Sequence, residues 1–172
     1  MSLDTLESLF LDQLKDMLHA EKQLVRALPR MAKAASSPEL EAAFTKHLKE
    51  TQGQVQRLER VFRELGENPR TKVCRGMAGL VEEGKEILEE DGEDAVIDAA
   101  LIAAAQRVEH YEIAAYGCLV TYAELLGQDR AVRLLQENLA EEEAADQKLT
   151  QLAEGGINQE AQTVGADAES EE

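Results

Sequence analysis

Four long stretches of the chain repeat apolar residues at intervals of three and four positions, which is the period of an amphipathic helix. They span residues 3–34, 36–65, 95–126 and 130–153. The 172 residues include only 3 prolines, and aromatic residues make up 3% of them, so little in the chain interrupts a helix or favours a strand. The pattern therefore predicts an all-α protein with four long helices.

The connections between these stretches predict how the helices are joined. Short turns separate the first stretch from the second and the third from the fourth, so each pair should form an antiparallel hairpin. Between the pairs, residues 67–92 combine several glycines with a shorter apolar pattern, which predicts a long crossover containing a short extra helix. Two hairpins joined by a long crossover form a ferritin-like four-helix bundle.

Local signals predict where some helices begin and end. Ser36 is expected to cap the second helix, with Glu39 completing a capping box. Gly66 is expected to end that helix, and Pro29 to kink the first one. Residues 1–154 should form one ferritin-like domain, and the polar, acidic residues 155–172 are expected to be a disordered tail.

Composition excludes several classes of partner. Asp and Glu number 35 against 18 Lys and Arg, and the resulting net charge of −17 repels nucleic acid and anionic lipid but attracts metal cations. The two cysteines are far apart, the N-terminus has no basic signal region, and no apolar run reaches membrane length. We expect a cytoplasmic protein with reduced thiols and no nucleic-acid or membrane partner.

Each predicted long helix carries ionisable residues on or beside its apolar stripe, near mid-length. In the fourth helix the run of three acids at 141–143 can turn at most two inward, and Glu143 with Asp146 is the preferred pair. The candidate ligands from all four helices are Glu21, His47, Glu50, Glu109, Glu112, Glu143 and Asp146.

Clustered carboxylates in an apolar core repel one another and take up protons unless cations neutralise them. Two divalent ions would do so directly. A site rich in oxygen donors, with few imidazoles and no thiolates, suits iron or manganese better than copper or zinc. The prediction is a pair of iron ions, with manganese as the alternative.

Ordinary structural roles remain open for each of these residues. Glu21 could pair with an arginine, His47 could be a hydrogen-bonded core histidine, and Arg57 could be a salt-bridge partner of Glu50. Glu109 and Glu112, three positions apart in the third helix, could be a pair of surface acids. Three further residues are predicted not to be ligands: His19, His110 and Tyr116.

Four segments of the chain resemble the YciE/YciF family of bacterial ferritin-like proteins: LFLDQLKDMLHAEKQLVRALPRMAKAA, HLKETQGQVQRLERVF, QRVEHYEIAAYG and LAEEEAADQKL. The resemblance covers residues 3–153. It implies a ferritin-like bundle, a homodimer, a dinuclear metal site and an association with bacterial stress responses.

The resemblance also implies a ligand pattern, from which this chain departs. Ferritin-like di-iron proteins use one Glu from each of two helices and a Glu-x-x-His from each of the other two. Glu21 and Glu109 match the single glutamates, and Glu112 would replace a missing ligand. No Glu-x-x-His occurs, and the nearest matches are His47 with Glu50 and Glu143 with Asp146. The ligand set and the reactivity therefore stay open.

Two functional hypotheses follow. In the first, the protein is an iron-dependent oxidoreductase or iron-handling protein whose ions, bridged by Glu50 and Glu143, react with peroxide or oxygen. One ion would be held mainly by Glu21, His47 and Glu50, and the other by the candidate ligands of the last two helices. In the second, it is a non-catalytic structural or partner-binding stress protein. Cage-type iron storage is disfavoured because nothing in the sequence establishes a large shell.

Overall fold

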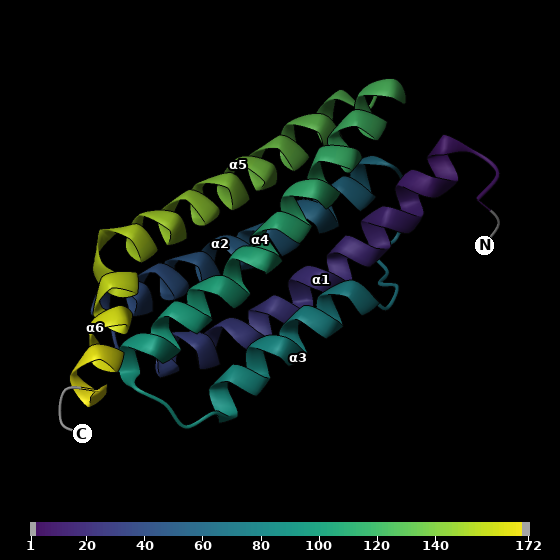
Figure 1. The fold of residues 1–172 in the computed structure, drawn as a ribbon. Coiled ribbons are helices and arrows are strands. Elements are labelled where there is room, and N and C mark those ends of the chain that lie inside the picture. Colours follow the sequence, from purple (N-terminus) through teal and green to yellow (C-terminus); the bar gives the residue numbers. More distant parts are fainter. Residues whose placement is uncertain (1–2, 170–172) are drawn as a thin grey trace.

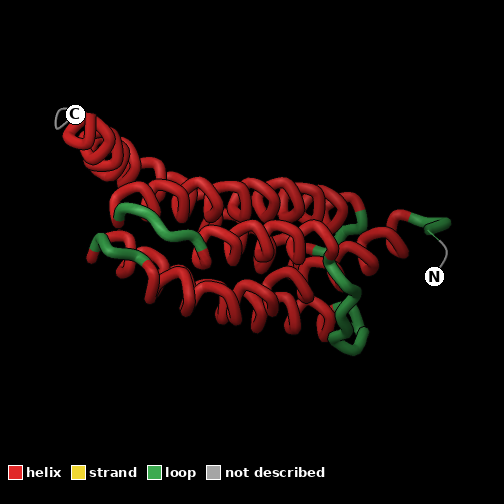
Figure 2. The backbone as a smooth tube through the Cα atoms, turned by 60° about the horizontal axis from the view of Figure 1, so that its bottom comes forward, coloured by secondary structure: helices red, strands yellow, loops and turns green. Residues whose placement is uncertain are grey.

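A computed structural model describes residues 3–169 of the chain, and these contain helices and loops but no strand (Figure 2). The prediction of an all-α protein is confirmed. The helices are α1 (Leu6–Ala34), α2 (Pro38–Glu64), α3 (Arg75–Glu89), α4 (Asp94–Leu125), α5 (Asp129–Leu152), the short π-helix η1 (Ala153–Ile157) and α6 (Asn158–Glu169).

The four long helices form a closed ring in which α1 packs on α2, α2 on α5, α5 on α4 and α4 on α1 (Figure 1). The crossover between the hairpins contains α3, which packs against α1 and α4. This segment returns the chain along the bundle, so that α4 starts at the end where α2 started. The ferritin-like connection predicted from the sequence is confirmed.

A buried aspartate fixes this connection. Asp98 on α4 is 3% exposed, and its two carboxylate oxygens accept hydrogen bonds from the backbone N–H groups of Ser36 at 2.9 Å and Ser37 at 2.7 Å. These groups lie in the turn between α1 and α2 and have no helical partner. Asp98 therefore ties the first hairpin to the start of the third long helix.

The predicted end of α2 is confirmed, but its start differs from the prediction in the capping residue and in the absence of a capping box with Glu39. Ser37, not Ser36, caps α2, because its Oγ accepts from the backbone N–H of Leu40 at 3.3 Å while the amide of Ser36 bonds to Asp98. Gly66 adopts a φ of 72° at the end of α2, as a residue without Cβ allows. Pro29 lies inside α1, which continues to Ala34.

The segment after residue 154 differs from the predicted disordered tail. It continues as η1, changes direction at Gly156 (φ 161°, ψ −40°) and forms α6, which packs against α4. Ile157 is 7% exposed and belongs to the core, so one apolar residue in a polar sequence anchors the segment to the bundle. Residues 170–172 lie outside the described chain.

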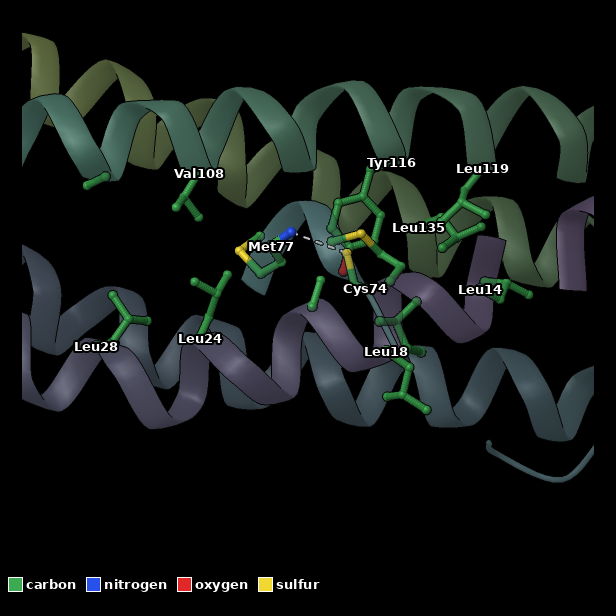
Figure 3. Packing of buried hydrophobic residues seen from close by; sticks show 14 of the residues in the cluster. Leu14, Leu18, Leu24, Leu28, Cys74, Met77, Val108, Tyr116, Leu119 and Leu135 are labelled. Carbon is green, nitrogen blue, oxygen red and sulfur yellow. Dashed lines mark hydrogen bonds between the residues drawn. The ribbon is translucent and has the colours of Figure 1, made fainter. Parts of the chain in front are cut away.

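The core runs the length of the bundle between the long helices (Figure 3). Leu14, Leu18 and Leu24 follow one side of α1, and Tyr116 and Leu119 face them from α4. Met77 extends this core to α3, where its backbone N–H donates to the Cys74 sulfur at 3.4 Å. None of the helices in residues 3–169 combines the length and the hydropathy needed to cross a membrane.

The bonds to Asp98 make a prediction about stability. Asp98→Ala leaves two backbone N–H groups without their partner, and should lower the free energy of unfolding by about 1–3 kcal/mol. Urea unfolding monitored by circular dichroism measures the change. Asp91→Ala, in the exposed loop before α4, is the matched control and should have little effect. Equal effects of the two variants would contradict this role for Asp98.

Candidate metal centre

All four long helices place buried ionisable side chains in the middle of the bundle. None of these residues is more than 6% exposed, although each carries a group that water would normally solvate. They are Glu21 on α1, His47 on α2, Glu109 and Glu112 on α4, and Glu142 on α5.

The ligand atoms of four of these residues converge. His47 Nε2 lies 3.3 Å from Glu109 Oε1 and 3.5 Å from Glu142 Oε2. One ligand atom from each of His47, Glu109, Glu112 and Glu142 lies within 4.8 Å of the other three. On the other side of the imidazole, Glu50 Oε2 lies 3.6 Å from His47 Nδ1, and the Glu50 side chain is 22% exposed. The cluster therefore offers imidazole and carboxylate donors to a shared position.

Most of the oxygen and nitrogen atoms that could bind a metal here have no hydrogen-bond partner in the described chain. Both carboxylate oxygens of Glu112 and of Glu142 are without a partner, as are Glu109 Oε2 and Glu21 Oε2. Neither nitrogen of His47 makes a hydrogen bond of good geometry. Buried polar atoms normally have partners because an unpaired one costs free energy. Oxygen and nitrogen atoms that gather around one point without hydrogen-bond partners are the pattern expected of residues that bind a metal ion.

Burial shifts the pKa values of these acids upward. It raises the pKa of Glu109 to about 8, against the ordinary 4.5, with the negative charge of Glu21 adding to the effect. Burial and then the charge of Glu142 raise the pKa values of Glu21 and Glu112 well above the ordinary value. Without a cation the cluster holds protons, and a bound cation would replace them.

His47 responds to the same environment in the opposite sense. Burial alone would lower its pKa, but the contact with Glu50 and the negative charges of Glu142 and Glu21 outweigh this effect, so the pKa of His47 is raised. The contact with His47 lowers the pKa of Glu50. Glu50 therefore lies behind the imidazole as a carboxylate and orients its Nε2 toward the other acids.

A chain of hydrogen bonds orients Glu21. The Tyr116 hydroxyl donates to Glu21 Oε1, and Asn138 Nδ2 donates to the Tyr116 oxygen at 2.9 Å. Arg57 Nε in turn donates to Asn138 Oδ1, and its Nη2 binds Glu141. The partner of Glu21 is thus a tyrosine and not an arginine, and Arg57 pairs with Glu141 instead of Glu50.

Of the seven predicted ligands, the structure brings together His47, Glu109 and Glu112, buries Glu21 on α1, and places Glu50 beside His47. The predicted inward orientation of Glu143 is wrong, because this residue is exposed. Asp146 is also outside the cluster: it lies 3.4 Å from the His110 Nε2 and accepts from Gln106 at 3.2 Å.

Glu142 belongs to the cluster but is not among the ligands predicted from the sequence. Leu139, three positions before Glu142, is only half-buried and does not mark the buried face of α5. The buried face includes Leu135 and Leu149, each seven positions, or two turns, from Glu142. Taking these two leucines as the reference would have identified Glu142.

The other histidines and Tyr116 take the predicted non-ligand positions. His19 Nδ1 accepts from the Cys74 backbone N–H at 3.2 Å, beside the start of α3. The His110 side chain is 69% exposed on the surface of α4. Tyr116 is fully buried in the core, where it contacts the cluster through Glu21.

A cleft of about 430 Å³ between α2 and α5 leads from the surface to the cluster. His47, Glu50 and Glu109 line it. Its walls are formed partly by small side chains, those of Ala42, Ala43, Ala144 and Ala145. A small molecule or ion can therefore approach the cluster from this side without displacing a helix.

Comparison with known proteins gives the same family from sequence and from structure. The model of the family described as a domain of unknown function, DUF892, matches residues 5–162. Protein YciF of Escherichia coli (strain K12) is 49% identical over 164 residues, which cover 94% of this chain and 98% of that protein.

Solved structures extend this likeness. The structure described as the E. coli stress protein YciF matches with a TM-score of 0.87 and 48% identity, over 91% of this chain and 99% of that one. A protein of Rhodopseudomonas palustris, described as a putative structural protein, matches with a TM-score of 0.84 and 46% identity, over 87% and 97%. A protein from Xanthomonas campestris shares the fold, with a TM-score of 0.70 and 22% identity over 98% and 100%.

The raised pKa values predict how the stability of the metal-free protein depends on pH. Because the pKa of Glu109 is about 8 in the folded protein and near the ordinary 4.5 in the unfolded chain, folding takes up protons between these values. The resulting stabilisation is complete below the unfolded pKa and is lost as pH rises through about 8. Urea unfolding of chelator-treated protein from about pH 5 to about pH 9 should show this loss.

Glu109→Gln provides the control for this measurement, since its amide does not titrate. The variant should lose less stability than the wild type over the same pH range. Identical pH dependences would contradict the assignment of a raised pKa to Glu109.

Proposed function

The chain belongs to the DUF892 family, and we propose that it is a metal-binding stress protein with a dinuclear centre in its bundle, iron being the first choice and manganese the alternative. The observation that carries the proposal is the group of buried ligand atoms from α2, α4 and α5 that converge without hydrogen-bond partners, with the buried Glu21 of α1 beside them. The similarity to a protein described as a stress protein supports the proposed role in stress.

The charge of the cluster supports two ions. Glu21, Glu109, Glu112 and Glu142 are four buried carboxylates, and two divalent cations would neutralise them when all four are ionised. His47 adds an imidazole, and Glu50 orients it or acts as a further ligand. In this proposal Glu142 takes the place predicted for Glu143 from the sequence.

The donor set favours iron or manganese. Carboxylate oxygens dominate the cluster, with one imidazole and no thiolate among the four converging residues. Hard and borderline ions prefer such donors, whereas thiolates are typical of zinc or copper(I) sites.

When bound, the two metal ions would supply the electrons for a reaction with peroxide or oxygen. The protein orients the ligands: Tyr116 and Asn138 hold Glu21, and Glu50 holds His47 so that its Nε2 faces Glu109 and Glu142. The apolar core excludes water from most of the cluster, and the cleft between α2 and α5 admits small reactants.

The description of the R. palustris relative favours a second candidate function, a structural protein without redox chemistry. In that case the buried acids would remain protonated and no metal would be needed. Metal content separates the two functions directly.

The experiment is metal analysis of the full-length protein, purified without chelator and loaded anaerobically with Fe(II). We expect about two ions per chain. Glu142→Gln should lose most of the bound metal because it removes a converging ligand. Glu143→Gln, the neighbouring exposed acid with the same change of charge, should keep it. Loss of metal in neither variant, or equal loss in both, would contradict the assignment of Glu142.

The two functions also predict different results for the wild type. About two iron or manganese ions per chain, with consumption of added peroxide, support the proposed centre. Absence of bound metal after anaerobic loading would favour the structural protein. Glu21→Ala combined with Glu109→Ala should abolish metal content, and unchanged content would refute the centre.

Tyr116→Phe tests the hydrogen bond that orients Glu21. Removing this bond should weaken metal binding by about 10- to 100-fold, as the loss of a residue that orients a ligand commonly does. Metal-competition titration with a chelator measures the change. Tyr122→Phe is the control, because the Tyr122 hydroxyl makes no hydrogen bond among the described residues. Equal affinities of the two variants would show that Tyr116 does not position Glu21.

A further inference from the structure

A second cavity, of about 270 Å³, lies between α1, α3 and α4. It is on the face of the bundle opposite the cleft between α2 and α5. Figure 3 shows two of its lining residues, Leu24 on α1 and Val108 on α4, pointing toward each other. The other apolar side chains that line it include Met31, Leu80, Val81 and Leu88. The interior of this cavity is therefore suited to a hydrocarbon group.

The charged residues around this cavity are all basic. Arg26, Arg30 and Lys85 line it, and no acidic residue of the described chain does, although acidic residues outnumber basic ones almost two to one. Lys85 pairs with two acids of its own helix. Arg26 and Arg30 have no ion pair among the described residues and lie one turn apart on α1, where like charges repel. An anion would relieve that repulsion.

The middle of α3 leaves part of this cavity unfilled. Gly84 is buried and lines the cavity, yet a Cβ added to it would meet no atom within 4 Å apart from its chain neighbours and the backbone of its own helix. Glycine inside a helix costs stability relative to alanine, and here no close contact requires it. The glycine therefore leaves room for a group that does not belong to α3.

We propose that this cavity binds an anionic amphiphile, with a short alkyl chain between α1, α3 and α4 and a carboxylate bound by Arg26 and Arg30. Guanidinium groups bind carboxylates through paired hydrogen bonds. The volume is close to the lower end of ligand pockets, about 300 Å³, so the alkyl chain is short. This site is separate from the metal centre, and the proposal goes beyond the proposed function.

The test is a calorimetric titration of the full-length protein with octanoate, compared with octan-1-ol and acetate. We expect one octanoate per chain. Octan-1-ol lacks the carboxylate and should bind about tenfold more weakly, as the loss of a charge-assisted hydrogen bond predicts. Acetate lacks the alkyl chain and should show no saturable binding. Equal binding of octanoate and octan-1-ol would overturn the role of the two arginines.

Two pairs of variants locate the site. Gly84→Leu fills the cavity and should abolish octanoate binding, whereas Gly79→Leu, on the exposed face of the same helix with equal open space around it, should not. Arg26→Gln with Arg30→Gln should weaken binding about tenfold. Arg63→Gln with Arg70→Gln, a matched change of charge at exposed positions, should leave it unchanged.

Circular dichroism and metal content of each variant show that fold and metal centre are intact. Octanoate binding that survives both Gly84→Leu and the change of Arg26 and Arg30 would place the ligand elsewhere and overturn the proposal. Absence of octanoate binding, combined with a Gly84→Leu protein that changes from dimer to monomer in light scattering, would instead identify the cavity as an interface between two copies of the chain.

Discussion

The burial of four carboxylates at the centre of an apolar bundle is the constraint on which the rest of this structure depends. Removing each charge from water costs several kcal/mol, and mutual repulsion adds to that cost. The negative charges are neutralised either by protons, as the raised pKa values of Glu109 and its neighbours indicate, or by cations. Apolar layers on both sides of the cluster, including Leu14 and Leu28 of α1, supply the stability that allows so polar a centre.

The two faces of the bundle differ because the crossover covers only one of them. On the α2–α5 side, small side chains leave a cleft that reaches His47. On the α1–α4 side, α3 packs across the bundle and leaves an apolar cavity beside Arg26 and Arg30. The topology thus gives one face access to the proposed metal centre and the other a separate apolar cavity, where the proposed amphiphile would bind. An excess of negative charge over the whole chain makes the basic edge of that cavity unusual.

Several polar contacts serve the fold and the centre at once. Asp98 joins the first turn to α4 and fixes the parallel arrangement of α2 and α4, which sets the positions of His47 and Glu109 relative to each other. Arg57 and Asn138 connect α2 with α5 and reach Glu21 through Tyr116. Changes in this network should therefore disturb the geometry of the proposed metal centre more than the helical content.

The sequence by itself determined the helices, their pairing into hairpins and the presence of acids on the apolar stripes, because apolar periodicity and glycine at helix ends are local properties. Only the tertiary structure decided which acid of the run at 141–143 is buried. Neighbouring residues point about 100° apart around a helix, and the packing of Leu135 and Leu149 selected Glu142. The tertiary structure also decided two further contacts, the hydrogen bond from Tyr116 to Glu21 and the anchoring of α6 by Ile157. Each of them joins residues that are far apart in the chain.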